Sequence, residues 1–159
     1  MVIIILLTII KKTEIKWEVI DVINNSYLLL SKDILYRCSF KSKEVSLYDW
    51  LNNDFYNEAF SELEKDNIIK NANNVFVLSK EQIEKYYPDN EKRVKRITAY
   101  AKKERVKDGV NIHDEDYSFY WISTVDGIKN CCVLNDGDFY FMRSEAEFIG
   151  VAPAIMIKK

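Results

Sequence analysis

Hydrophobic and polar positions alternate in the first third of the chain, which is the pattern of a half-buried β-strand. Ile15, Trp17 and Val19 alternate with Lys16 and Glu18, as expected when successive side chains point to opposite faces of a sheet. A turn cluster at 24–26 and a second apolar run at 27–31 follow. We therefore predict a β-hairpin at the start of the fold.

Helical spacing replaces this alternation in the middle of the chain. Apolar residues one helical turn apart fall on a single face at Leu47, Trp50, Leu51 and Phe55,. Capping-box spacings, in which a Ser is followed three residues later by an acidic residue or Gln, occur at Ser46, Ser61 and Ser79,. They predict short helices after each Ser. Ala59, Phe60, Leu63 and Ile68 supply the apolar positions of the second helix, and Pro88 ends the third,.

The last third returns to strand patterns. Apolar runs occupy 117–124, 128–134, 139–142 and 149–157, and a shorter one lies earlier at 75–78. Asp126-Gly127 and Asn135-Asp136-Gly137-Asp138 supply turns between them,. No linker divides the 159 residues, so we predict one α+β domain over 1–159, with a mostly antiparallel sheet and two to four short helices.

The composition and net charge indicate which kinds of partner are not favoured. An apolar fraction of 48% with 30% charged residues is that of a globular protein, and a net charge of −2 does not favour nucleic acid or an anionic membrane,. The stretch 91–107 holds eight basic and two acidic residues, and acids follow at 114–116. We interpret the stretch as a solvated helix face that meets those acids, the alternative being a phosphate-binding surface with Tyr100 among its cations.

The apolar segment from Met1 to Ile10 could be a strand or part of an export signal. It is half the length of a membrane span, and its Lys pair comes after the apolar run instead of before it,. We interpret it as a buried strand, with a truncated signal as the alternative. On this basis we expect a cytoplasmic protein without a membrane span, the alternative being a fragment of a cell-surface protein.

Several fragments resemble, in order, a bacterial and phage-associated domain of unknown function. The fragments are Trp17–Ile20, Leu28–Ser31, Asp49–Phe60, Val75–Ser79, Thr98–Ala101, Trp121–Thr124 and Gly150–Ala154. That family carries Trp-Leu-Asn with Phe-Tyr and Ala-Phe, then Trp-Leu-Arg-Ser, and ends in Gly-Val-Arg-Pro-Ala. The resemblance implies a C-type-lectin-like fold, related to that of formylglycine-generating enzymes. It covers the chain from about residue 16 onward.

The chain departs from this family at two arginines. Ala152 stands where the closing motif has Arg, and Trp121-Ile122-Ser123 lacks the Arg of the central motif. Either a shared ligand site has lost part of its contacts, or the arginines are structural in the family and the fold has compensated. The resemblance therefore supports a fold and transfers no arginine-dependent site.

Candidate chemistry is sparse. His113 beside the acids at 114–116 lacks the spacing of a zinc motif, and the polar residues at 135–138 are explained by a turn,. We expect neither a metal nor a cofactor. A catalytic alternative would have to use His113, the single histidine, or the adjacent thiols of Cys131 and Cys132,. Neighbouring strand residues point to opposite faces, so we expect free core thiols in a reducing compartment, as for the third cysteine, Cys38.

We therefore predict a non-catalytic recognition domain whose binding face lies in the loops around the strand of Trp121. Loops on a rigid sheet carry variable function, and exposed Tyr side chains favour recognition. Tyr140 is expected on an exposed face as well. The partner could be a protein, a glycan or a small ligand; the alternatives are an enzyme and a structural fragment of a larger surface protein. The predicted site consists of Tyr117, Tyr120, Trp121, Asp126, Asn135, Asp136 and Asp138.

Overall fold

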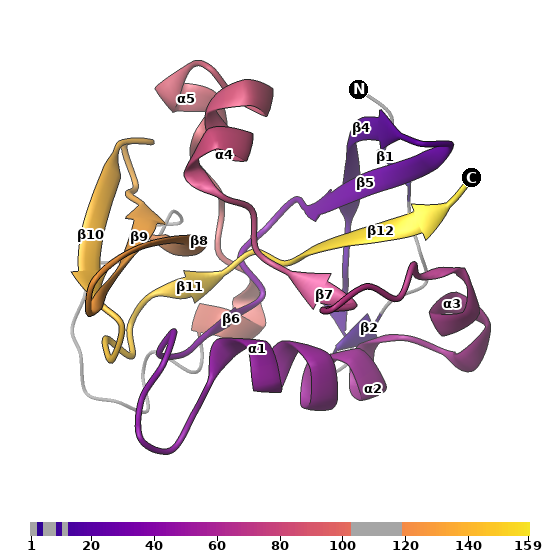
Figure 1. Ribbon diagram of the computed structural model, residues 1–159, viewed down its shortest axis with the longest axis horizontal. Coiled ribbons are helices and arrows are strands. Elements are labelled where there is room, and N and C mark those ends of the chain that lie inside the picture. The colour runs from indigo at the N-terminus through magenta and orange to yellow at the C-terminus, as the bar shows by residue number, and fades with distance from the viewer. Residues whose placement is uncertain (1–2, 5–8, 11–12, 103–118) are drawn as a thin grey trace.

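The computed structural model describes residues 3–4, 9–10, 13–102 and 119–159, and within these ranges the chain forms two five-stranded sheets (Figure 1). The first has the order β1-β4-β5-β12-β7, with β1 Ile3–Ile4, β4 Trp17–Ile23, β5 Ser26–Ser31, β12 Ala154–Lys158 and β7 Val75–Phe76. The second has the order β10-β9-β8-β11-β6, with β10 Phe139–Arg143, β9 Lys129–Val133, β8 Tyr120–Asp126, β11 Gly150–Val151 and β6 Tyr36–Arg37. A separate pair joins β2 Ile9–Ile10 to β3 Thr13–Glu14.

The pairing within the sheets is antiparallel apart from the parallel contact of β11 with β8. This confirms the predicted α+β class with mostly antiparallel sheets. Within the N-terminal apolar segment the described residues are β1 and β2, which are strands as predicted but pair in different sheets.

Short helices cover both sides of the sheets. They are α1 Leu47–Trp50, the π-helix η1 Leu51–Phe55, α2 Tyr56–Ala59, α3 Glu62–Asn67, α4 Lys80–Tyr86 and α5 Asn90–Arg93. The described ranges thus hold these five α-helices and a further helical stretch at 99–102, more than the predicted two to four helices. Figure 1 shows α1 and α2 along one side of the molecule and α4 and α5 on the opposite side.

Local capping chemistry decides two of these helix starts. Ser61 and Ser79 form complete capping boxes with Glu64 and Gln82, as predicted. Ser46 makes no side-chain cap hydrogen bond, so the third predicted box is wrong. A capping box requires the longer Glu or Gln to reach back to the cap amide, and residue 49 is the shorter Asp.

Two hydrophobic cores lie on opposite faces of the sheets. Trp121, Cys132 and Leu29 belong to the core that packs against the helical stretch from α1 to α2. Their neighbours Tyr120 and Cys131 belong to the core that contains Ile83 of α4. Successive strand residues enter different cores because side chains alternate between faces. Odd-numbered and even-numbered residues of these strands are therefore both buried, so alternation along the strand does not reveal which residues are exposed.

The closing segment connects the two sheets. β11 pairs in one sheet and β12 in the other, and the carbonyl of Pro153 between them accepts the Ser31 amide at 2.9 Å. A Cβ on Gly150 would lie 2.7 Å from the carbonyl oxygen of Phe119, so this position requires glycine. Ala152 is 2% exposed, which makes it a core position in this chain.

Candidate functional site

A pocket of about 540 Å³ opens between the β5–β6 connection, the segment after α4 and the β9–β10 turn. We call it the Lys95 pocket. Its lining consists of Glu18, Lys32, Asp33, Tyr87, Glu91, Lys92, Val94, Lys95, Arg96, Asn135 and Asp136. Pockets that gather polar groups around a buried ionisable side chain are candidates for ligand binding.

Backbone pairing brings the basic segment 94–98 onto the β5–β6 connection. Ile34 forms an isolated parallel bridge with Ile97. The Ile34 amide donates to the Arg96 carbonyl at 2.8 Å, and the Thr98 amide donates to the Ile34 carbonyl at 3.0 Å. The two apolar side chains of this bridge are buried. Their burial fixes the segment, and with it the position of Lys95.

Lys95 is the most enclosed charged group of the pocket, at 7% exposure. Its ammonium donates to the carbonyl oxygens of Ser31 at 2.7 Å and Lys32 at 3.2 Å, and it lies 6.0 Å from the ring centroid of Tyr120. Burial lowers the pKa of Lys95 from its ordinary 10.5 to about 8, although the charge of Glu18 opposes this shift,. An ammonium has three donors, so one donor remains beyond the two backbone bonds when the described residues are considered.

Glu18 and Tyr87 place a hydrogen-bonded pair beside this ammonium. The Tyr87 hydroxyl donates to Glu18 Oε2 at 3.3 Å, and the Glu18 side chain is 8% exposed. Burial raises the pKa of Tyr87, and the charge of Glu18 raises it further. The phenol therefore stays protonated, and the pocket offers an ammonium, a phenol and a carboxylate at its wall.

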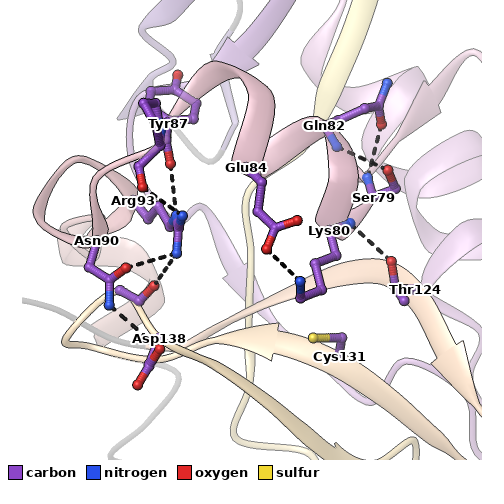
Figure 2. Close-up of polar contacts among 12 residues, drawn as sticks. Ser79, Lys80, Gln82, Glu84, Tyr87, Asn90, Arg93, Thr124, Cys131 and Asp138 are labelled. Carbon is purple, nitrogen blue, oxygen red and sulfur yellow. Dashed lines mark hydrogen bonds and ion pairs between the residues drawn. The ribbon is translucent and has the colours of Figure 1, made fainter.

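Arg93 fixes the β9–β10 turn that forms one side of the pocket. Figure 2 shows its guanidinium between α4, α5 and the turn. It donates to the carbonyls of Tyr87 at 2.8 Å, Pro88 at 2.9 Å and Gly137 at 3.3 Å, and to Asn90 Oδ1 at 2.9 Å. The guanidinium therefore has a structural role, and it holds the turn against α5.

Gly137 allows the close approach of this turn. Its φ is +83°, and a Cβ there would lie 1.9 Å from the carbonyl oxygen of Asn90. Asp136 stabilises the turn locally, since its Oδ1 accepts the Asp138 amide at 3.0 Å. The prediction that residues 135–138 form a turn is confirmed. The hydrogen bond between Asp136 and Asp138 shows that some of their polar groups stabilise the turn itself.

The structure separates the predicted site residues. Asn135 and Asp136 line the Lys95 pocket, and Asp138 is exposed beside it with an Oδ1 that faces Asn90 Nδ2 at 3.5 Å. Asp126 lies at the opposite end of β9, because consecutive hairpin turns alternate between the ends of a strand. Five residues at about 3.4 Å each place the two turns roughly 17 Å apart. The turn of Asp126 adjoins a different pocket, lined in part by Val125 and Ile128.

Both aromatic residues of β8 are core residues, which contradicts the predicted exposure of Tyr120 and the inclusion of Trp121 in the predicted binding site. Tyr120 is 2% exposed and donates its hydroxyl to the Arg93 carbonyl at 2.6 Å. Trp121 is fully buried and donates Nε1 to the Cys38 carbonyl at 2.8 Å. Both faces of β8 are covered, so neither ring can meet a ligand from solution. Tyr140, at 55% exposure, is on the surface as predicted. Tyr117 lies outside the described residues.

The cysteine pair is sealed in the two cores. Cys131 and Cys132 are both fully buried and unbridged, and they belong to different cores, as the alternation predicted. Burial raises the pKa of Cys131 and raises that of Cys132 to about 12. A nucleophilic cysteine needs the opposite shift and an open environment. His113 lies outside the described residues.

Sequence reasoning missed Lys95 and Glu18, and misjudged the basic stretch. We predicted a solvated helix face, but α5 ends at Arg93, and the side chains of Arg93 and Lys95 are buried. The acids at 114–116 lie outside the described residues. The apolar Ile97 was the available signal in the sequence. Residues two positions apart point to the same face of an extended chain, so a buried Ile97 implies that Lys95 points inward as well,.

Comparisons with family models, with curated proteins and with solved structures find no match. The family resemblance and the lectin-like fold therefore stay predictions. Among the described residues, no group of histidine, cysteine and acidic side chains could hold a metal ion, and no helix is long and apolar enough to cross a membrane.

Proposed function

We propose that this protein is a non-catalytic binding domain that holds a small zwitterionic ligand in the Lys95 pocket. The observation that carries this proposal is the enclosed ammonium of Lys95 with one donor left over, next to the carboxylate of Glu18. An anionic group of the ligand accepts from Lys95, and a cationic or hydroxyl group donates to Glu18. The pair then recognises a molecule that carries both kinds of group.

The entrance of the pocket supports a ligand of mixed charge. Lys32, Lys92 and Arg96 are exposed cations around it, while Glu91 and Asp136 are exposed acids. A ligand with one sign of charge would meet repulsion from part of this ring. Hydrogen bonds to charged groups contribute roughly 1.5–3 kcal/mol, so two of them suffice for selective binding of a small molecule.

The polar groups of the Lys95 pocket are better suited to ligand binding than to catalysis. With a pKa of about 8 the Lys95 amine is still mostly charged at neutral pH, and two of its three donors are already held by backbone carbonyls, so little of it is in the nucleophilic neutral form,. Tyr87 is held protonated and donates to Glu18 instead of acting as a base. The groups therefore act as fixed donors and acceptors.

Titration of the protein with free amino acids, followed by NMR chemical shifts, tests the proposal. Acetate and a simple alkylamine serve as probes that carry only one of the two charges. We expect shift changes at Lys95, Tyr87 and Asn135 with the zwitterions, and at least tenfold weaker binding of both single-charge probes.

Two variants test whether the ligand binds in the Lys95 pocket or elsewhere on the surface. Glu18→Gln removes the carboxylate charge and keeps the hydrogen-bonding shape, so we expect about tenfold weaker binding of the zwitterions. Lys129→Met removes an exposed cation at the far end of β9 and is the matched control. Shift changes that map elsewhere, or equal losses in Glu18→Gln and Lys129→Met, contradict the proposal.

A further inference from the structure

Among the residues that the structure describes, β10 is a sheet edge with no strand paired to its outer side. It is the terminal strand of its sheet, and the other edge strands of the described ranges have two residues each, against five in β10. Figure 1 shows it at the outer left of the molecule. Natural proteins protect edge strands from pairing with other chains by short strands, prolines, bulges or charged side chains. β10 pairs with β9 without a bulge, contains no proline, and has Arg143 as its single charged residue.

The hydrogen bonds at the two ends of the β9–β10 ladder show which groups of β10 point outward. The Leu134 amide donates to the Asp138 carbonyl at 2.8 Å, and the Ser144 amide donates to the Ile128 carbonyl at 3.2 Å. In an antiparallel pair, hydrogen-bonded and non-hydrogen-bonded positions alternate. Even-numbered residues from 138 to 144 therefore bond toward β9, and the backbone groups of the odd-numbered residues point away from it.

The outward groups form a short unoccupied ladder. They are the amides of Phe139, Phe141 and Arg143 and the carbonyls of Phe139 and Phe141. Within the ranges that the structure describes, these groups have no hydrogen-bond partner. The Arg143 carbonyl accepts the Ala146 amide at 3.0 Å. Such a row of alternating donors and acceptors is a template for a further strand.

We propose that β10 pairs with β10 of a second copy of this chain, around a two-fold axis at Phe141, and forms a continuous ten-stranded sheet. In this register each Phe141 exchanges both backbone bonds with its symmetry mate. Phe139 of each copy lies opposite Arg143 of the other, and Tyr140 lies opposite Met142. The strand is therefore complementary to itself.

The side chains of β10 favour pairing with β10 of a second copy over pairing with a different strand. A two-fold axis at Phe141 places no charged residue opposite a like charge, since Arg143 meets an aromatic ring. Tyr140, at 55% exposure, gains a thioether neighbour, a contact that is favourable for aromatic rings,. A two-fold interface uses one patch twice, which a self-complementary strand satisfies.

A concentration series in analytical ultracentrifugation, run on the whole chain, tests the proposal together with two variants of one residue. Arg143→Pro removes an outward amide and leaves the ladder to β9 intact, because that amide does not bond to β9. Arg143→Ala keeps the amide and removes only an exposed side chain. We expect a wild-type dimer in the micromolar to millimolar range, weakened at least tenfold by Arg143→Pro and much less by Arg143→Ala.

Amide hydrogen exchange provides a readout that does not depend on a variant folding. The amides of Phe139, Phe141 and Arg143 should exchange fast in dilute samples and become protected in concentrated ones. Those of Tyr140 and Met142 should be protected in both. A chain that stays monomeric at every concentration, a dimer that Arg143→Pro leaves unchanged, equal weakening by both variants, or outward amides without added protection each overturn the proposal.

Discussion

The buried ammonium of Lys95 makes folding stability depend on pH above about pH 8. Its pKa is about 8 in the folded chain against an ordinary 10.5. Below pH 8 the amine is charged in both states, and the cost of its burial is fully present. Between about pH 8 and 10.5 the unfolded chain binds more protons than the folded one, so the free energy of unfolding rises with pH.

The size of this effect follows from the shift. One pKa unit corresponds to 1.36 kcal/mol, so the complete window contributes about 3 kcal/mol, and the part between about pH 7 and pH 9 contributes about 1 kcal/mol. All three thiols act in the opposite direction, since burial also raises the pKa of Cys131. Burial raises the pKa values of Cys38 and Cys132 from 9.0 to about 12, so each favours unfolding as pH rises above 9. The stability of the wild-type chain should therefore pass through a maximum where the two windows begin to overlap, at about pH 8 to 9.

Comparison with Lys95→Met isolates the lysine, because the thiols contribute equally to both chains. Urea unfolding followed by tryptophan fluorescence, under reducing conditions, gives the free energy of unfolding at each pH. The variant also leaves the carbonyls of Ser31 and Lys32 without their donor, but this cost does not vary with pH. We expect the wild type to gain about 1 kcal/mol relative to Lys95→Met from about pH 7 to pH 9. A difference that stays constant over this range would refute the reasoning, since Lys95 would then keep its ordinary pKa in the folded state.

Three further predictions concern the packing around the pocket and the cores. Gly137→Ala should cost several kcal/mol and Gly127→Ala about 1 kcal/mol, because both have positive φ but the second has nothing within 4 Å of the new Cβ,. Equal costs in urea unfolding would contradict the clash at Gly137. Asn52→Leu should cost about 2–3 kcal/mol, since its amide bonds to four backbone groups that join the helical stretch to β7,. Asn53→Leu, at an exposed neighbour, should stay within about 0.5 kcal/mol of wild type,. Cys132 should resist thiol reagents in the folded chain and react at the rate of unfolding, which rapid labelling before denaturation would disprove.

Two of the eleven lining residues of the candidate site were anticipated from the sequence. Asn135 and Asp136 were predicted because turn residues between two apolar runs mark an exposed loop, and this loop forms one wall of the pocket. Lys95 was not predicted, because a lysine within a charged stretch is normally solvated. Its burial depends on the bridge between Ile34 and Ile97. These residues are far apart in the chain, so no local pattern reports their contact.

The aromatic part of the predicted site failed for a related reason. Alternation identifies the buried face of a strand only when the other face is solvated. In β8 and β9 each face has its own core, so Tyr120 and Trp121 are both buried. Their runs of consecutive apolar residues are typical of strands that are covered on both sides, and in this chain that covering comes from α1 to α2 on one face and α4 on the other.

Local chemistry in the sequence determined the elements: the hairpin from β4 to β5 with its Asn24-Asn25 turn, the capping boxes at Ser61 and Ser79, and the turn at 135–138. These depend on residues within a few positions of one another. Only the tertiary structure decided that the closing segment would join two sheets, that Lys95 would be enclosed beside Glu18, and that β10 would be the terminal strand of its sheet within the described ranges. These features arise from contacts between distant segments, whose burial and hydrogen bonding depend on the complete fold.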